Sequence, residues 1–285
     1  MGAVSALVPH TPPAPLRPLV STAVGYRVPA YPTGVHRGLP SHHLTLVVEL
    51  LAPLTVTGLD RPVSAHGVVG GLHTRPALID ATGPQEGLQY GLTPLGARVL
   101  LGLPAGELRD SAVDLAAVLG PSAPRLVDRL AGAADWSERF RLLDSALVAR
   151  LAARRWGART GPETLPAEVA EAWRIILVSH GAVPVTAVAA HVGWGRRHLG
   201  ERFRAATGLT PKEAARVVRF ERAQRTLRTR RVPLAELAVT CGYSDQPHLA
   251  REWRALTGAS ITTWLREELP FVQDAAPPRE EHSPT

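Results

Sequence analysis

Residues 241–258 read CGYSDQPHLAREWRALTG, and a similar stretch, VGWGRRHLGERFRAATG, occupies residues 192–208. An offset of 49 aligns the Gly-aromatic pairs of the two stretches. One residue is inserted in the second stretch, and an offset of 50 then aligns the closing Thr-Gly pairs at 207–208 and 257–258. A duplicated supersecondary unit is the simplest interpretation of this pattern.

Each copy contains the parts of a helix-turn-helix. Its first helix carries a small residue, Ala189 or Ala238, where the second helix must pass closely. A glycine then permits the tight turn, because a Cβ would be costly there. Apolar residues four positions apart predict the buried face of each second helix, Leu199 with Phe203 and Leu249 with Trp253. Ser244 or Asp245 can cap the second of these helices, whereas the first copy offers only Gly195, a weaker cap.

The opposite face of each second helix is expected to be exposed and to read base edges in DNA. Arginine suits guanine, glutamine suits adenine, and glutamate can accept a hydrogen bond from cytosine. Such side chains are needed near the N-terminal end of a recognition helix. The predicted DNA-contacting residues are Arg196, Arg197, His198, Glu201 and Arg204 in the first copy, and Ser244, Gln246, His248, Arg251 and Arg254 in the second.

A single amphipathic helix, 211–229, is predicted between the copies, with Pro211 in its first turn. A helix of this length spans about 28 Å, and successive major-groove faces of a duplex lie about 34 Å apart. Two recognition helices could therefore enter consecutive grooves. Five arginines of the spacer could approach phosphates, namely Arg216, Arg219, Arg222, Arg225 and Arg228. Because helical phase spreads them around the axis, we expect some of them to be only solvated.

The stretches GLTPKEAARVVRFERA and CGYSDQPHLAREWRALTGAS, within two helix-turn-helix units joined by a long helix, resemble the DNA-binding domain of the AraC/XylS family of bacterial transcription regulators. The resemblance covers about 167–268 and implies binding of promoter DNA and altered recruitment of RNA polymerase. It assigns DNA contacts to the exposed positions named above, although the family more often has Arg at Glu201. The sequence also departs from the family at Ile261, usually Pro, and at Gly195, usually Ser.

Charge and composition agree with a nucleic-acid partner. Residues 184–270 hold 15 basic and 8 acidic residues, a net charge of +7, which equals that of the whole chain. A local basic field favours a polyanion. The single cysteine, Cys241, excludes an intrachain disulfide and is read as a core residue. With no apolar stretch of about 18 residues, no secretion signal and no catalytic motif, we expect a cytoplasmic protein that is not an enzyme.

The predicted fold class is α+β: a small β-barrel-like unit plus helices, followed by an all-α domain. Strand-like segments run from about 22 to 92, and the apolar period becomes helical from about 94. The predicted domains are a flexible Pro-rich arm (1–19), a sensor or dimerisation domain (20–155), a linker (156–166), the double helix-turn-helix domain (167–270) and a disordered tail (271–285). The helices expected after the linker cover 167–179, 184–191, 195–207, 211–229, 233–240, 245–257 and 260–268.

The N-terminal segments GVHRGLPSHHLTLVV and GGLHTRPALI resemble the uncharacterised domain that precedes this DNA-binding domain in many such regulators. A β unit followed by helices could offer a small-molecule effector pocket and a helical face for a homodimer. The candidate effector-binding residues are Arg37, His42, Arg75 and Arg98, which could equally be solvated or pair with Asp80 and Glu49.

The histidines of the N-terminal domain raise the question of a metal site. In a β-barrel such residues can gather round a metal, as in cupins, but no H-x-H pair with a suitably spaced Glu is present, so we expect no metal or cofactor. The histidines concerned are His36, His42, His43, His66 and His73. Two rival interpretations remain, a metal- or small-molecule-binding β-barrel enzyme with a scaffolding helical domain, and a module that docks on another protein. Steeply salt-dependent duplex binding would separate a regulator from both.

Overall fold

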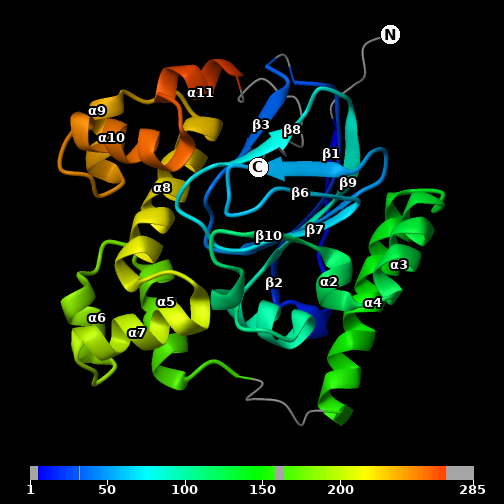
Figure 1. The fold of residues 1–285 in the computed structure, drawn as a ribbon. Coiled ribbons are helices and arrows are strands. Elements are labelled where there is room, and N and C mark those ends of the chain that lie inside the picture. The colour runs from blue at the N-terminus through cyan, green and yellow to red at the C-terminus, as the bar shows by residue number, and fades with distance from the viewer. Residues whose placement is uncertain (1–5, 32, 158–163, 268–285) are drawn as a thin grey trace, which may run out of the picture.

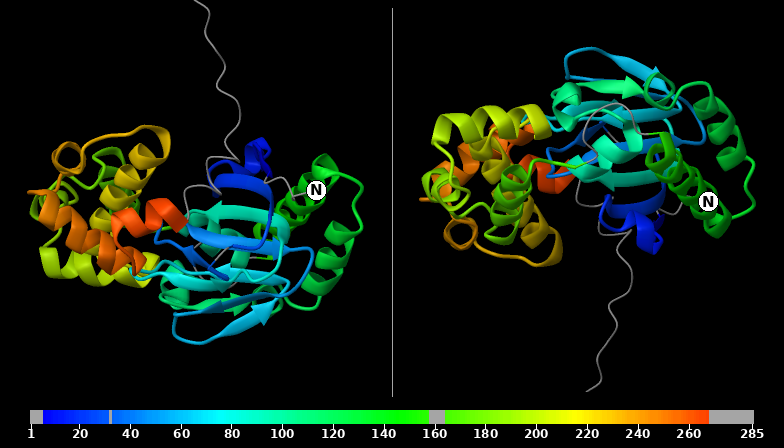
Figure 2. Two further views of the ribbon diagram at one scale, coloured as in Figure 1. Left: turned by 90° about the horizontal axis from the view of Figure 1, so that it is seen from above. Right: turned by 90° about the horizontal axis from the view of Figure 1, so that it is seen from below.

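The computed structural model describes residues 6–31, 33–157 and 164–267. An antiparallel β-sandwich lies in the middle of the molecule (Figures 1 and 2). The C-terminal helical domain flanks it on one side, and the helices α3 (Ser122–Ala131) and α4 (Trp136–Gly157) flank it on the opposite side. None of the helices in these described ranges combines the length and the apolar character needed to cross a bilayer.

The sandwich consists of two separate sheets rather than one closed barrel, although the predicted α+β class is confirmed. The larger sheet has the strand order β1-β2-β9-β4-β7-β10, and the smaller one has the order β3-β8-β5-β6. Every neighbouring pair is antiparallel. The strands are β1 (Ala6–Pro9), β2 (Val20–Val28), β3 (Val35–Gly38), β4 (Leu44–Glu49), β5 (Leu54–Thr57), β6 (Val63–Ala65), β7 (Gly67–Gly70), β8 (Ala77–Asp80), β9 (Gln85–Leu92) and β10 (Ala112–Asp114).

Alternation along the larger sheet builds the layers, because successive side chains of a strand point to opposite faces. In β4, Leu44, Leu46 and Val48 are fully buried and join the core on the helical side. Val47 faces the other way and packs with residues of the smaller sheet such as Val56. The larger sheet is therefore covered on both faces, by helices on one and by the smaller sheet on the other.

Short helical segments lie between β1 and β2 and between β9 and α3. Asp135 caps α4, since the backbone N–H of Glu138 donates to Asp135 Oδ1 at 2.8 Å. On its buried side, α4 presents Asp144, whose carboxylate accepts a hydrogen bond of 2.9 Å from the Tyr90 hydroxyl of β9. The short helical segments are η1 (Ala14–Leu16), α1 (Pro94–Gly96), η2 (Ala97–Leu101), η3 (Ala105–Leu108) and α2 (Leu115–Leu119).

The described part of the N-terminal arm does not have the flexible structure predicted for residues 1–19. Residues 6–9 form the edge strand β1, which pairs with β2. Leu16 is fully buried and Leu19 nearly so. Proline is compatible with an edge strand because one side of such a strand needs no partner, and the two leucines tie the segment to the core.

The seven C-terminal helices begin and end within about one residue of the predicted bounds, a closer agreement than element ends usually allow. The long helix α8 carries a capping box formed by Thr210 and Glu213, with Pro211 at its start. Ser260 caps the last helix, since its Oγ accepts from the N–H of Thr263 at 3.0 Å, so this helix begins without the proline usual in the family. The helices are α5 (Ala167–Val178), α6 (Val185–His191), α7 (Arg196–Thr207), α8 (Pro211–Thr229), α9 (Leu234–Thr240), α10 (Gln246–Thr257) and α11 (Ile261–Glu267).

Most of the predicted linker, residues 158–163, and the predicted tail, 271–285, lie outside the described residues. The helix α4 ends at Gly157 and α5 begins at Ala167, which brackets the linker.

Candidate functional site

The two copies of the repeat fold into units with the same turn. In the first, α6 ends and the N–H of Trp194 donates to the carbonyl of Ala189 at 3.0 Å. In the second, Tyr243 makes the same bond to Ala238 at 2.9 Å. The glycines before these aromatic residues have φ values of +72° and +78°, in the left-handed region that a side chain disfavours.

The closing Thr-Gly pairs also perform the same task in both copies. Thr207 is fully buried and its hydroxyl donates to the carbonyl of Phe203 at 2.9 Å. Thr257 is fully buried too and bonds the carbonyl of Trp253 at the same distance. Each threonine Oγ also accepts the N–H of the residue two positions later. The threonine oxygen thus satisfies a backbone N–H just beyond the end of each helix.

The N-terminal ends of α7 and α10 differ, as expected. Asp245 caps α10 by accepting the N–H of His248 at 2.6 Å, and this bond lowers the pKa of the Asp245 carboxyl. Gly195 supplies no side-chain cap to α7. The helix α10 is therefore fixed at its start by a side chain, and α7 is not.

The predicted DNA-facing residues lie on the outside of both helices, and the predicted core residues lie inside. Leu199, Phe203, Leu249 and Trp253 are fully buried. In the first unit Arg197 forms an ion pair with Glu201 at 2.9 Å while both side chains stay largely exposed. The exposed predicted residues are Arg196, Arg197, His198, Glu201, Arg204, Ser244, Gln246, Arg251 and Arg254, and His248 is half-buried. Cys241 is buried, which raises the pKa of its thiol, in agreement with a core role.

The arginines of α8 divide into three groups. Arg216 forms an ion pair with Glu252 of α10 at 2.6 Å, and Arg219 donates to the carbonyl of Gly181, so these two brace the helical domain. Arg222 is exposed. Arg225 and Arg228 line a cavity shared with the sandwich.

This cavity has a volume of about 500 Å³ and lies within the sandwich, where α8 closes it. Valine, leucine and isoleucine side chains of both sheets line its interior, among them Val24, Val47, Val56 and Ile79. One face of α8 contributes polar groups at positions 221, 224, 225 and 228, which fall on the same side of a helix. The sandwich also contributes polar side chains to the lining, among them His36, Gln85 and Gln89. A cavity lined by aliphatic side chains together with several polar groups is typical of a small-molecule site.

The four candidate effector-binding residues do not come together. Arg37 lines the cavity and forms an ion pair with Glu267 of α11 at 2.9 Å. His42 lies at the domain boundary, 2.7 Å from Glu221. Arg75 pairs instead with Asp60 at 2.8 Å, and neither it nor Arg98 lines the cavity.

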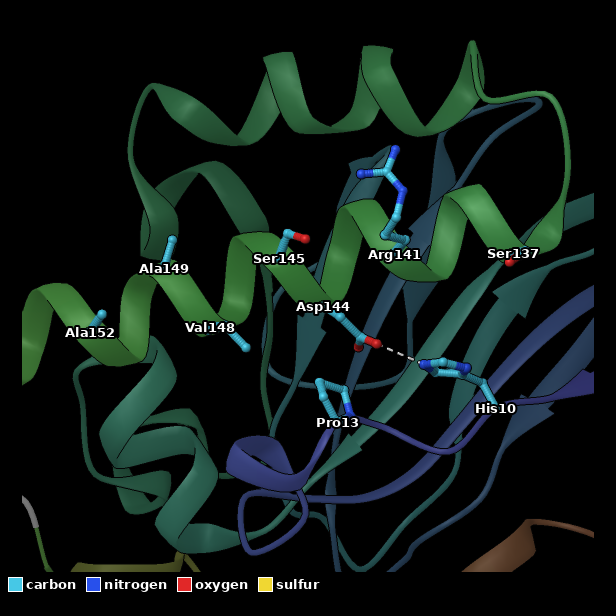
Figure 3. A pocket seen from close by; sticks show the side chains of 9 residues that line it. All are labelled: His10, Pro13, Ser137, Arg141, Asp144, Ser145, Val148, Ala149 and Ala152. Atoms are coloured by element: carbon cyan, nitrogen blue, oxygen red, sulfur yellow. Dashed lines mark hydrogen bonds and ion pairs between the residues drawn. The ribbon is translucent and has the colours of Figure 1, made fainter.

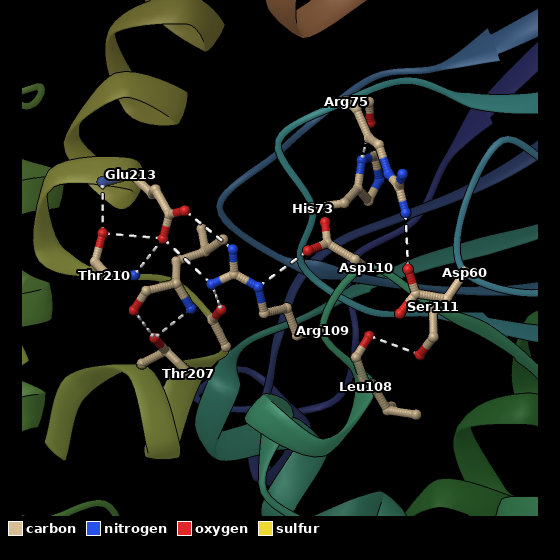
Figure 4. A network of polar contacts seen from close by, with 12 residues as sticks. Asp60, His73, Arg75, Leu108, Arg109, Asp110, Ser111, Thr207, Thr210 and Glu213 are labelled. Atoms are coloured by element: carbon tan, nitrogen blue, oxygen red, sulfur yellow. Dashed lines mark hydrogen bonds and ion pairs between the residues drawn. The ribbon is translucent and has the colours of Figure 1, made fainter. Parts of the chain in front are cut away.

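A second contact joins the domains near the C-terminal end of α7 (Figure 4). Arg109, which follows η3, donates to the carbonyl of Gly208 at 2.7 Å and to both carboxylate oxygens of Glu213, at 3.0 and 3.3 Å. Glu213 and Asp110 both raise the pKa of Arg109, the bond to Glu213 most strongly. The helix start of α8 is thereby tied to the sandwich domain.

A groove of about 650 Å³ runs along α4, on the side of the sandwich opposite the C-terminal helical domain (Figure 3). His10 lies at its base, with Nε2 at 2.7 Å from Asp144 Oδ2 and its ring stacked on Phe140. The groove is lined by His10, Pro13, Ser137, Arg141, Asp144, Ser145, Val148, Ala149 and Ala152.

Sequence reasoning missed the polar groups that connect the domains. Glu221 and Gln224 were not predicted as site residues. Arg225 and Arg228 were predicted only as arginines that could approach phosphates, and nothing local indicated that these positions face a cavity. No local pattern indicated that Arg109 contacts the helical domain, because its partner Glu213 lies 104 positions away in the sequence.

Comparison with known proteins agrees with this architecture. A family described as "Helix-turn-helix domain" matches residues 188–267. No curated protein matches the chain in sequence. Three crystal structures of ToxT from Vibrio cholerae are similar to nearly the whole chain, each at 8% identity. The match to the P21 crystal form of ToxT covers 86% of this chain and 98% of the ToxT chain, with a TM-score of 0.53.

The two other structures contain ligands. The match to ToxT with a bound unsaturated fatty acid covers 90% of this chain and 97% of the ToxT chain, with a TM-score of 0.53. ToxT bound to (E)-4-(8-methylnaphthalen-1-yl)but-3-enoic acid covers 86% and 98%, with a TM-score of 0.54. At this identity the likeness concerns the fold. In residues 188–267 the chain therefore matches a helix-turn-helix family, and its fold as a whole is similar to that of ToxT.

Proposed function

We propose that the protein is a sequence-specific transcription regulator that inserts α7 and α10 into consecutive major grooves of promoter DNA. The observation that carries this proposal is the pair of matching units at the two ends of α8 (Figure 1), each with an exposed polar helix face. The 19 residues of α8 span about 28 Å. Groove faces on one side of a duplex repeat at about 34 Å, so modest DNA bending or the offset of the recognition helices closes the difference.

Both recognition helices offer the chemistry that base edges require. On α10, Gln246 and Arg251 are exposed and lie on a helix whose start is fixed by Asp245. On α7, Arg196 is exposed beside the Arg197–Glu201 pair. The net charge of +7 in this third of the chain supplies the attraction to phosphate.

The test compares two arginine substitutions on a duplex selected by the protein from a randomised pool. Arg251→Ala should weaken binding to the selected duplex by about 1–3 kcal/mol and leave binding to random duplex nearly unchanged. Arg129→Ala removes the same charge from α3, an exposed position on the other side of the sandwich, and should change neither. Equal losses on both duplexes would argue against base readout by Arg251.

We further propose that the cavity binds a small effector with an apolar body and an anionic head. Valine and isoleucine side chains fit the body, and Arg225 and Arg228 of α8 supply positive charge at one side. The two ToxT ligands named above are both carboxylic acids with an apolar body. Because α8 belongs to the DNA-binding domain, an occupant would contact both domains and so influence how the recognition helices are held.

A thermal-shift titration with a cis-unsaturated C16 fatty acid tests this second part. A saturable rise in Tm is expected for the wild-type chain and a weaker one for Arg225→Gln. Arg222→Gln is the matched control, because Arg222 lies on the same helix but does not line the cavity. Equal titrations for both variants would contradict the role of Arg225.

The proposal also includes RNA polymerase as the downstream partner and a homodimer formed through the α3–α4 layer. That layer lies on the far side of the sandwich from the DNA-binding domain, so pairing through it leaves both recognition helices accessible (Figure 2). Sedimentation equilibrium of the wild-type chain and of Val148→Glu, which changes the groove along α4, tests the dimer. A wild-type chain that is monomeric at all concentrations would contradict the proposed dimer.

A further inference from the structure

Two histidines of the sandwich and one glutamate of the DNA-binding domain meet at the domain boundary. His42 and His43 directly precede β4, and Glu221 lies in the middle of α8. Each offers one ligand atom, and these atoms lie within 4.8 Å of one another. In the described part of the chain, this is the one group of at least three histidine, cysteine or acidic side chains gathered in this way.

The contact between His42 and Glu221 does not account for His43. His42 Nδ1 lies 2.7 Å from Glu221 Oε2, which is an ordinary hydrogen bond. The Nδ1 atom of His43 is buried and has no hydrogen-bond partner. Buried polar atoms without partners are uncommon, and each calls for an explanation such as an ion.

The backbone of β9 closely approaches the ring of His43. At Gly91 a Cβ would be 2.4 Å from Thr22 Oγ1 and 2.5 Å from His43 Cδ2. A residue larger than glycine at position 91 would therefore displace one of these side chains. Glycine at this position leaves room for the His43 imidazole beside His42 and Glu221.

Other pairs of histidine and carboxylate in the molecule lack a third group. His10 with Asp144 and His191 with Glu171 form similar contacts, at 2.7 and 3.1 Å, and no further ligand gathers at either. A polar contact between domains needs no second histidine. The combination of two imidazoles with one carboxylate is instead a common ligand set for borderline divalent cations.

We propose that His42, His43 and Glu221 bind one divalent cation of the Zn²⁺ class, which links the sandwich to α8. Ligand atoms on a tetrahedral zinc ion lie about 3.3 Å apart, given metal–ligand distances of about 2.0–2.2 Å. The His42–Glu221 separation of 2.7 Å must open slightly and the widest separation, at most 4.8 Å, must close.

His43 and Glu221 both belong to the lining of the cavity, so an ion held by them would lie at the cavity wall. The side chains of His42 and Glu221 are 27% and 14% exposed, so an ion can enter from solvent. An ion held from both domains stabilises their docked arrangement by mass action, because it binds the folded, docked chain more tightly than the unfolded one. This inference does not depend on the identity of any effector.

The first test titrates Zn²⁺ into full-length protein that has been stripped with a chelator, with a chromophoric chelator as competitor. The wild-type chain is expected to bind one ion per chain and to show a higher Tm when loaded. His43→Gln and Glu221→Gln should each weaken binding by more than about 100-fold, since even the loss of an outer-shell partner costs about 10- to 100-fold. His191→Gln, which changes a histidine–glutamate pair on the protein surface, should bind like the wild type.

The second test uses only the wild-type chain, so it holds even where a variant folds poorly. X-ray absorption of the zinc-loaded protein should show a first shell of nitrogen and oxygen with the outer-shell scattering of two imidazoles. Absence of one-to-one binding, equal affinity in all variants, or a first shell that contains sulfur would each overturn the proposal.

Discussion

Arg109 provides a quantitative test of how the two domains are joined. Its guanidinium makes three bonds across the boundary, to the carbonyl of Gly208 and to both oxygens of Glu213, and a fourth to Asp110 at 2.9 Å. The side chains of Arg109 and Glu213 are 21% and 23% exposed. The pair is therefore neither a surface ion pair, worth about 0.2–1 kcal/mol, nor a fully buried one, whose disruption costs about 3–5 kcal/mol.

Arg109→Ala should lower the free energy of unfolding by about 2 kcal/mol, between these limits. A double-mutant cycle with Glu213→Gln should give a coupling of about 1–2 kcal/mol, because each change removes the same charge-assisted bonds. The measurement is urea unfolding followed by tryptophan fluorescence and far-UV circular dichroism, which must coincide for a two-state analysis. Hydrogen exchange of the amides in η3 and at the end of α7 should rise in the Arg109→Ala variant.

The coupling also has a pH dependence with a definite sign. The bonds from Arg109 lower the pKa of Glu213, although burial acts in the opposite direction. A carboxyl whose folded pKa lies below its unfolded value stabilises the fold above that unfolded value, and the contribution is lost as pH falls through the folded pKa. The coupling should therefore be complete at pH 7 and decline below about 4.5.

The matched control is Arg75 with Asp60, a pair of the same chemistry within the sandwich domain, with side chains 48% and 60% exposed. Its coupling should stay below about 0.5 kcal/mol. A coupling for Arg109 and Glu213 no larger than that of the control would refute the conclusion that this contact fastens the domains.

Three further changes test the local structure. Thr257→Val keeps the shape of the side chain but leaves the N–H of Ala259 without its partner, and should cost about 1–3 kcal/mol in a denaturant titration. A negligible cost would mean that the Thr-Gly endings are not held by the hydroxyl. Thr210→Ala removes the cap of α8 and should cost about 1 kcal/mol, measured in the same way. Glu86, whose pKa is lowered mainly by its bond from Arg27, should stabilise the fold above about pH 4.5 and lose this effect in acid. Glu86→Gln should therefore flatten the acid side of the stability profile, and an unchanged profile would contradict this assignment.

The helical domain was predictable almost residue by residue because its determinants are local. The apolar residues four positions apart, the glycines that permit left-handed turns and the Thr-Gly endings each act within one unit. The repeat then supplied every signal twice. Even the difference between the caps, Asp245 in one copy and Gly195 in the other, followed from single residues.

The sandwich was less predictable because its determinants are distant in sequence. The segment 6–9 becomes a strand because β2 offers an edge, whereas the prolines of residues 1–19 had suggested a mobile arm. β3 and β8, which pair with each other, are short and carried no clear alternation. The cavity and the gathering of His42, His43 and Glu221 arise only when α8 docks on the sheets, which no local pattern encodes.

Hydroxyl-radical and methylation-interference footprinting on a selected duplex shows whether α7 and α10 bind one face of the DNA together. We expect two protected segments about one helical turn apart on the same face, with interference at purines in both. Arg251→Ala should remove interference in one segment only, and Arg196→Ala in the other. A single protected segment, or two on opposite faces of the duplex, would mean that the two helices do not bind in consecutive grooves.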